Sequence, residues 1–157
     1  MCIVIDANTF ASIFNINSAD HQEYRPVKDW VTNGCGFIVY GGAKYKKELE
    51  RATKYLRIIV ELRKAGRVKE IDDMLVDEHQ AQVEALVNDV NCNDAHLIAI
   101  FRVSRCRLLC SNNLRSDRYV KDRSLYMHNQ RPPLIYRGRR HRNLLCSRYI
   151  VSLHHVV

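Results

Sequence analysis

Short runs of hydrophobic residues alternate along this chain with longer segments in which hydrophobic residues recur every three or four positions. The short runs are typical of strands that are buried on both faces, and the wider spacing is typical of helices with one buried face. This alternation predicts an α/β protein, a three-layer α/β/α sandwich with a central parallel sheet. The predicted strands are residues 3–6, 37–40, 68–71, 108–110 and 134–136, with 68–71 as a possible edge strand.

Helical spacing marks the segments between these strands. Asn8 and Asn93 stand where helix caps are expected, and Gly66 follows the longest helical pattern as a helix end. The second helix has an uncertain start, because polar residues precede it without a clear cap. The predicted helices are residues 8–15, 26–31 (or from an earlier start), 43–65, 72–88, 93–103 and 114–126.

Composition narrows the class of protein. Of the 157 residues, 46% are hydrophobic and 27% are charged, which is typical of globular proteins, and the length suits a single domain over residues 1–157. No run approaches the ~18 hydrophobic residues that a membrane helix needs, and Asp6 ends the first run too early for a signal peptide. Six cysteines without a Cys-x-x-Cys pair do not indicate a disulfide framework or a zinc site. We therefore expect a cytoplasmic protein with no membrane partner.

Positive charge is concentrated in the last third of the chain. Residues 102–148 hold 13 basic and two acidic side chains, a balance of +11, and 12 of the 13 are arginine. Guanidinium groups form paired hydrogen bonds to phosphate, so this segment predicts a nucleic-acid partner. An acidic protein partner or a solvated basic face is the alternative. The tyrosines expected to stack on unpaired bases are Tyr119, Tyr126, Tyr136 and Tyr149.

Acidic residues stand where an α/β sheet binds its ligands, beyond the carboxyl ends of the strands. Asp6 follows the first strand, Glu48 lies early in the helix after the second strand, and Asp94 opens a later helix. Carboxylates that share one cleft repel one another unless a cation neutralises them. Oxygen ligands select Mg²⁺ or Mn²⁺ over zinc, so the pattern predicts a site for a hard divalent cation.

Each of these residues also has an ordinary structural interpretation. Asp6 or Asp94 alone is often a helix cap, and Glu48 can pair with basic neighbours on a helix surface. Glu50 competes with Glu48 as the second acidic residue of the site. His96 falls among hydrophobic residues, and we expect it to be packed or hydrogen-bonded rather than a metal ligand.

The ordered set of motifs resembles the PIN-domain nucleases over nearly the whole chain. The motifs are a strand followed by Asp-x-Asn, an early-helix glutamate, Asn-Asp-Ala-His opening a hydrophobic helix, and a strand that ends in Ser-Asn-Asn. The resemblance implies a parallel sheet flanked by helices and a cleft of acidic residues that holds Mg²⁺ or Mn²⁺. It also implies cleavage of phosphodiester bonds, most often in RNA. Asp6, Glu48 and Asp94 match three of the acidic positions of the family.

The fourth acidic position departs from the family pattern. The family usually has an aspartate just after the fourth strand, where this chain has Asn113, and Asp117 matches a later acidic position across a shortened turn. Three alternatives follow. Asp117 supplies the missing carboxylate, with Asn113 as a neutral contributor; the site is weakened; or catalysis has been lost. Asn8 and Ser111 are expected to orient carboxylates or waters.

The sequence thus predicts a divalent-metal-dependent endoribonuclease. Its predicted catalytic and metal-binding residues are Asp6, Glu48, Asp94 and Asp117, with Asn113 contributing to catalysis. Its predicted phosphate contacts are Arg115, Arg118, Arg137, Arg139 and Arg140. By analogy with small members of the family, we expect a toxin held inactive by an antitoxin protein, and a homodimer. The alternatives are a catalytically impaired RNA-binding or interaction module and a structure-specific DNA nuclease.

Overall fold

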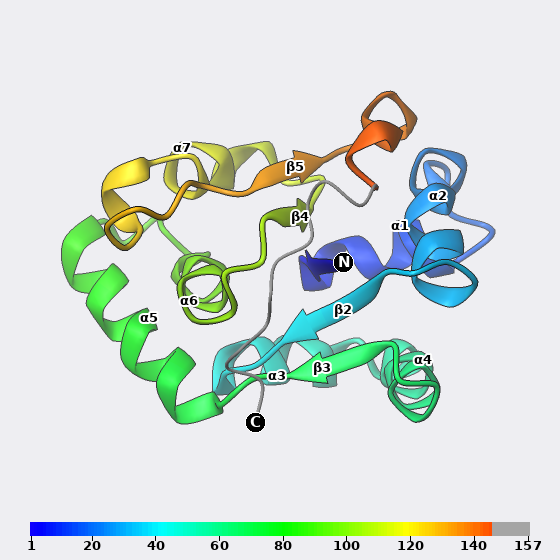
Figure 1. Cartoon of the computed structure of the whole chain (residues 1–157), viewed down its shortest axis with the longest axis horizontal. Helices are drawn as coiled ribbons and strands as arrows, with labels where there is room; N and C mark the ends of the chain where they lie inside the picture. The colour runs from blue at the N-terminus through cyan, green and yellow to red at the C-terminus, as the bar shows by residue number, and fades with distance from the viewer. Residues whose placement is uncertain (146–157) are drawn as a thin grey trace.

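Five parallel strands form the central sheet of the computed structural model, which describes residues 1–145 (Figure 1). The sheet order is β3-β2-β1-β4-β5, so β1 is central and β3 lies at an edge as predicted. All five predicted strands are present, with ends that differ by one residue at most. The strands are β1 (Cys2–Ile5), β2 (Phe37–Tyr40), β3 (Val68–Glu70), β4 (Leu108–Cys110) and β5 (Leu134–Tyr136).

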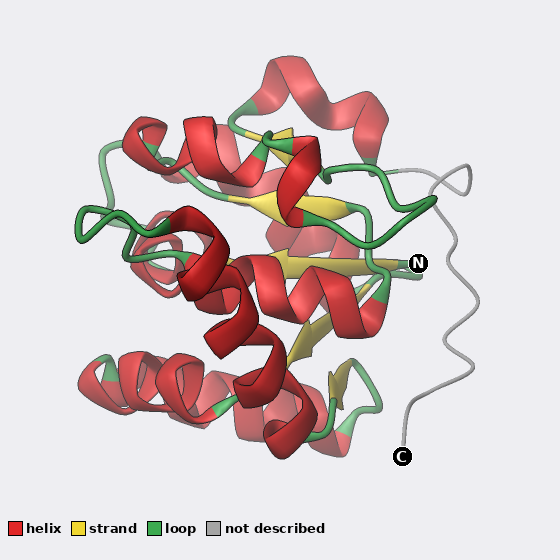
Figure 2. Cartoon of the chain, turned by 90° about the vertical axis from the view of Figure 1, so that its left-hand side faces the viewer, coloured by secondary structure: helices red, strands yellow, loops and turns green. Residues whose placement is uncertain are grey.

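Helices cover both faces of the sheet, which makes a three-layer α/β/α sandwich (Figure 2). All four residues of β1 are buried. In the register, Ile3 lies opposite Ile38 of β2, and Val4 lies opposite Leu109 of β4. Strands that are covered on both faces have continuous hydrophobic sequences, which is why short hydrophobic runs were sufficient to find them.

The helices divide between the two faces. Helices α1, α2 and α4 lie on one side of the sheet, and α5 and α6 lie on the other (Figure 1). Helix α2 has the earlier of the two predicted starts, so Pro26 lies inside it. The α-helices are α1 (Phe10–Phe14), α2 (His21–Thr32), α3 (Ala43–Arg51), α4 (Thr53–Lys64), α5 (Asp73–Val87), α6 (Ala95–Ser104) and α7 (Asp117–Val120). The 3-10 helices are η1 (Ala7–Thr9), η2 (Leu114–Ser116), η3 (Arg123–Leu125) and η4 (Arg139–Leu144).

Residues 43–65 form two helices, so the prediction of one continuous helix is wrong. Ala52 ends α3 with a non-helical backbone (φ −100°, ψ 56°), and α4 begins at Thr53. Helix α3 contacts α6 and η1, whereas α4 contacts α1 and β3. Each helix has its own buried stripe, and the hydrophobic spacing continues through Ala52. Spacing alone therefore did not show the break.

The start of α3 is held by two carboxylates of α5. The Gly42 N–H donates to Oδ1 of Asp73 (2.8 Å), and the Ala43 N–H donates to Oδ1 of Asp77 (2.9 Å). The first backbone N–H groups of a helix have no partner within that helix. Here Asp73 and Asp77, which follow their donors by 31 and 34 residues, accept these hydrogen bonds. Gly42 has φ 89°, and a Cβ there would lie 2.6 Å from Cγ1 of Val76, so only glycine fits.

The local structure near the carboxyl edge of the sheet differs from prediction at three places. Asp6 rather than Asn8 caps the first turn, because its Oδ1 accepts the Asn8 N–H (3.2 Å). Asp94 rather than Asn93 stands at the N-cap position of α6. Residues 114–126 form η2, α7 and η3 instead of one helix. Side-chain caps at the starts of η2 and η3 compete there with a continuous helix.

Cysteine thiols contribute to the core. Cys2, Cys106 and Cys110 are buried, and no disulfide joins the five cysteines of residues 1–145. Cys146 and the hydrophobic end of the chain lie outside the described residues. Among residues 1–145, every helix is too short or too polar to cross a membrane.

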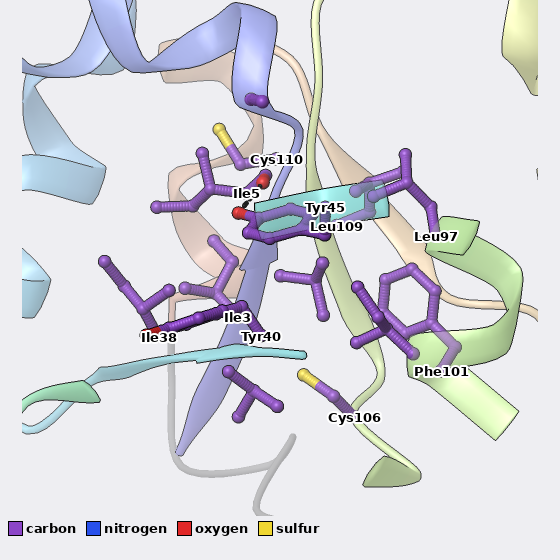
Figure 3. Close-up of a cluster of buried hydrophobic side chains, with 14 of the residues drawn as sticks. Ile3, Ile5, Ile38, Tyr40, Tyr45, Leu97, Phe101, Cys106, Leu109 and Cys110 are labelled. Atoms are coloured by element: carbon purple, nitrogen blue, oxygen red, sulfur yellow. Dashed lines mark hydrogen bonds between the residues drawn. The ribbon is translucent and has the colours of Figure 1, made fainter. Parts of the chain in front are cut away.

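Tyr45 connects α3 to the end of β1 inside the core (Figure 3). Its fully buried ring stacks on Tyr40, with 5.7 Å between ring centroids, and its hydroxyl donates to the main-chain oxygen of Ile5. Burial raises the pKa of Tyr45 well above its ordinary value, and the negative charges of Asp6 and Glu48 add to this effect. The hydroxyl therefore stays protonated and remains a hydrogen-bond donor.

The substitution Tyr45→Phe is expected to lower the free energy of unfolding by about 1–2 kcal/mol, because the Ile5 carbonyl loses a buried donor. Urea denaturation followed by circular dichroism measures the change. Tyr55→Phe is the matched control, since Tyr55 is also buried but its hydroxyl has no hydrogen-bond partner among residues 1–145. Equal losses in the two variants would contradict a stabilising Tyr45–Ile5 hydrogen bond.

Candidate acidic cleft

Asp6 leaves the end of β1 with both carboxylate oxygens in hydrogen bonds. The residue is 3% exposed, its Oδ2 accepts the Ser111 hydroxyl (2.9 Å) and its Oδ1 accepts the Asn8 N–H (3.2 Å). Its own N–H donates to the Cys110 carbonyl (2.9 Å). Ser111 directly follows β4, so the carboxyl ends of two neighbouring strands bring these groups together. Ser111 orients Asp6 through its side chain, whereas Asn8 does so through its backbone.

Glu48 lies one turn after Tyr45 on α3 and is hydrogen-bonded to His96 of α6. Nε2 of His96 lies 3.1 Å from Oε2 of Glu48, and His96 is 1% exposed. Burial opposes ionisation of Glu48, but the hydrogen bond with His96 and the positive charges of Lys44 and Arg51 favour it, and the pKa of Glu48 lies below its ordinary value. Within residues 1–145, Nδ1 of His96 has no partner. His96 is thus a packed, hydrogen-bonded histidine, as the sequence indicated.

Asp94 opens α6, and its carboxylate makes no capping hydrogen bond. Burial raises the pKa of Asp94, and the negative charges of Asp6 and Glu48 raise it further, while His96 acts in the opposite direction. Asp94 therefore lies within electrostatic reach of both other carboxylates. The structure brings the three acidic residues from three separate elements to one edge of the sheet.

A cleft of about 880 Å³ opens beside these carboxylates. Asp6 is too buried to line it, but its neighbour Asn8 does. Glu50, the competitor of Glu48, is exposed outside the cleft. The lining consists of two carboxylates, four asparagines, two arginines and two hydrophobic side chains: Asn8, Glu48, Val90, Asn91, Asn93, Asp94, Asn113, Leu114, Arg115 and Arg118.

The acidic edge fits a hard divalent cation by its chemistry, although it is not a closed metal cage. Carboxylate oxygens are the ligands that Mg²⁺ and Mn²⁺ prefer, and a cation would offset the burial and the neighbouring negative charges that raise the pKa of Asp94. Among residues 1–145, no group of three or more His, Cys, Asp or Glu side chains is placed to hold a metal ion. Mg²⁺ is commonly held by only one or two carboxylates, together with waters and substrate phosphates, and this donor set fits that mode.

Asp117 is paired with Arg137 and does not line the cleft. Nη1 and Nη2 of Arg137 donate to its two carboxylate oxygens (2.9 and 2.6 Å), and Nζ of Lys121 donates at 3.1 Å. These hydrogen bonds lower the pKa of Asp117 against the opposing effect of burial. Asn113 does line the cleft, with its Oδ1 accepting the Arg115 N–H (3.1 Å). The prediction that Asp117 supplies a fourth carboxylate disagrees with this pairing, because its charge is already neutralised.

The predicted phosphate-binding arginines lie in different places. Arg115 and Arg118 are exposed and line the cleft. Arg137 is engaged in internal hydrogen bonds. Arg139 and Arg140 are exposed on η4, which packs against α2, and the Arg139 N–H donates to a glutamate of that helix (3.0 Å). The positive charge at the cleft therefore comes from Arg115 and from Arg118, whose Nη2 also lies 3.5 Å from Oδ2 of Asp89, and not from the whole basic segment.

The tyrosines do not form the predicted base-stacking surface. Tyr126 and Tyr136 are buried, so the prediction is wrong for both. Tyr119 is half-buried and its hydroxyl donates to Asp89 (2.5 Å). Tyr149 lies outside the described residues. The hydrophobic side chains that do line the cleft, Val90 and Leu114, were missed because each stands alone among polar neighbours in the sequence.

Three comparisons with known proteins found no relative of this chain. No model of a protein family, no curated protein and no solved structure matches it. The side chains that line the cleft determine which ligands it can bind. Guanidinium groups bind phosphate oxygens, and carboxylate oxygens bind hard cations.

Asp94→Asn is expected to raise the free energy of unfolding at pH 7. The folded-state pKa of Asp94 lies above its unfolded value, so its stabilising contribution is full below the unfolded pKa and is lost as pH rises through the folded pKa. The gain should disappear below about pH 3, where aspartate is protonated in both states. Urea denaturation at pH 7 and below about pH 3 measures the free energy of unfolding of the variant and of the original chain.

The control for Asp94→Asn is Asp89→Asn, for which the opposite sign is expected. The Tyr119 hydroxyl lowers the pKa of Asp89, so that carboxylate stabilises the fold above its unfolded pKa. A loss of stability in Asp94→Asn that persists at low pH would contradict an electrostatically strained Asp94.

Asp117→Asn is expected to lower the free energy of unfolding at pH 7 by about 2 kcal/mol, because Arg137 loses its charged partner. Thermal or urea denaturation measures the loss. Lys121→Gln, which removes the exposed partner of the same carboxylate, should cost less than about 0.5 kcal/mol. Unchanged or increased stability in Asp117→Asn would contradict the pairing and favour a place for Asp117 among the repelling carboxylates.

Proposed function

We propose that this chain is a divalent-metal-dependent endoribonuclease of the PIN-like kind that its motifs resemble. The observation that carries the proposal is the electrostatic coupling of Asp94 with Asp6 and Glu48 at the edge of an open cleft. Burial and two neighbouring carboxylates raise the pKa of Asp94, and perturbed pKa values gather at functional sites. RNA as the substrate comes from the resemblance and from the arginines at the cleft.

Glu48 and Asp94, the two carboxylates that line the cleft, are the residues that would hold the cation, with the buried Asp6 beside them. Asp6 is oriented by the Ser111 hydroxyl, and the Asp94 carboxylate makes no capping hydrogen bond. A bound Mg²⁺ or Mn²⁺ would supply an activated water and would stabilise charge on the phosphate. This assignment needs only two protein carboxylates, in keeping with the absence of a three-residue metal group within residues 1–145.

The remaining groups of the cleft have roles that follow from their charge. Arg115 and Arg118 bind the phosphates and hold the scissile bond against the carboxylates. His96 fixes the orientation of the Glu48 carboxylate through their hydrogen bond.

A second candidate is an RNA-binding module that has lost catalysis. Asn113 at the fourth acidic position and the engagement of Asp117 by Arg137 favour this alternative. An antitoxin partner and a homodimer remain expectations from the resemblance, and none of the described contacts bears on them. The two candidates share the cleft and differ in whether phosphodiester bonds are broken.

Cleavage of an unstructured RNA oligonucleotide in the presence of Mn²⁺, followed by gel electrophoresis, tests the proposal. The purified chain should cut the RNA, and EDTA should stop the reaction. Glu48→Gln and Asp94→Asn should each lower the rate at least about 100-fold, because each removes a carboxylate that would hold the cation.

Glu50→Gln is the matched control for this assay. Glu50 lies on the same helix as Glu48 but is exposed outside the cleft, so its loss should leave the rate unchanged. Binding of RNA without cleavage, unaffected by EDTA, would overturn the nuclease and support the RNA-binding module. A strong preference for nicked or flapped DNA would instead support a DNA nuclease.

A further inference from the structure

Two hydrophobic side chains at the cleft are exposed to solvent. Val90, in the connection between α5 and α6, is 95% exposed, and Leu114, at the start of η2, is 68% exposed. Single exposed hydrophobic residues are common on protein surfaces and need no explanation. These two differ because they come from segments far apart in the chain and line the same cleft as the acidic residues.

The groups around this pair are of two further kinds. Arg115 directly follows Leu114, and Arg118 lies one turn later with its guanidinium 4.5 Å from the ring centroid of Tyr119. Amide side chains of Asn91 and Asn93 stand on the same lining. The lining of one cleft therefore holds hydrophobic side chains, positive charge and amide groups, of which the Asn91 amide also donates to Asp89 (3.1 Å).

A nucleotide is the ligand that has all three matching features. Its phosphate pairs with guanidinium groups, its base presents a flat face of low polarity, and the base edge bonds with amides. In a duplex the faces of the bases are stacked on one another and are closed to side chains. Val90 and Leu114 can therefore contact a base only in an unpaired strand.

We propose that Val90 and Leu114 form a subsite for an unpaired nucleobase, which makes the cleft selective for single-stranded RNA. The choice of RNA rests on the proposed function, whereas the base contact rests on the cleft itself. A protein partner fits less well, because stable protein interfaces bury about 800 Å² on each side, far more than two side chains provide. Two side chains match the face of one or two bases.

Fluorescence anisotropy in EDTA tests this subsite without any need for catalysis. The probes are a labelled single-stranded RNA oligonucleotide and an abasic oligonucleotide with the same sugar-phosphate backbone. The double substitution Val90→Ser with Leu114→Ser should weaken binding of the RNA about tenfold, since hydrophobic contact with the bases is lost. Binding of the abasic oligonucleotide, which depends on phosphate contacts, should not change.

Met74→Ser with Ile16→Ser is the matched control. These residues are 82% and 70% exposed outside the cleft, and their replacement should leave both affinities unchanged. The subsite is overturned if the double variant binds RNA as tightly as the original chain, or if it loses affinity equally for both probes. It is also overturned if sedimentation shows that the substitutions abolish self-association while RNA binding is intact, because a second copy of the chain would then occupy the cleft.

The outcomes for the subsite and for the nuclease are separable. Base-dependent binding without cleavage in Mn²⁺ keeps the subsite and rejects the nuclease. Cleavage that is insensitive to the double substitution, with unchanged binding of both probes, keeps the nuclease and rejects the subsite.

Discussion

The hydrogen bond from Tyr45 to the carbonyl of Ile5 fixes the geometry on which the acidic edge depends. It joins the helix that carries Glu48 to the last residue of the central strand, immediately before Asp6. Because the donor and acceptor are buried, the two elements cannot shift relative to each other without leaving polar groups unpaired. The Tyr45 hydrogen bond thereby fixes the helix of Glu48 relative to the strand end that carries Asp6.

The charged groups of this edge are of two kinds, and the difference explains which of them suit a ligand. Asp117 is neutralised by Arg137, which makes it part of the framework. Burial and the charges of Asp6 and Glu48 disfavour the ionised form of Asp94, although His96 acts in the opposite direction. A positively charged ligand gains most from the second kind of group.

Much of the fold could be predicted from the sequence, because strands covered on both faces must be continuously hydrophobic. The grouping of Asp6 and Glu48 followed from the rule that parallel strands end at one edge. The break at Ala52 and the pairing of Asp117 could not be predicted, since both depend on contacts between segments distant in sequence. Motif spacing identifies a carboxylate, but only tertiary structure shows whether a guanidinium already neutralises it.

The capture of the first amides of α3 by Asp73 and Asp77 has a consequence for the order of folding. These amides stay unsatisfied until the chain has passed through β3 and begun α5. The start of α3 therefore gains all of its hydrogen-bond partners only after a contact that is not local in sequence has formed. During synthesis, this contact becomes possible when about half of the chain has been made.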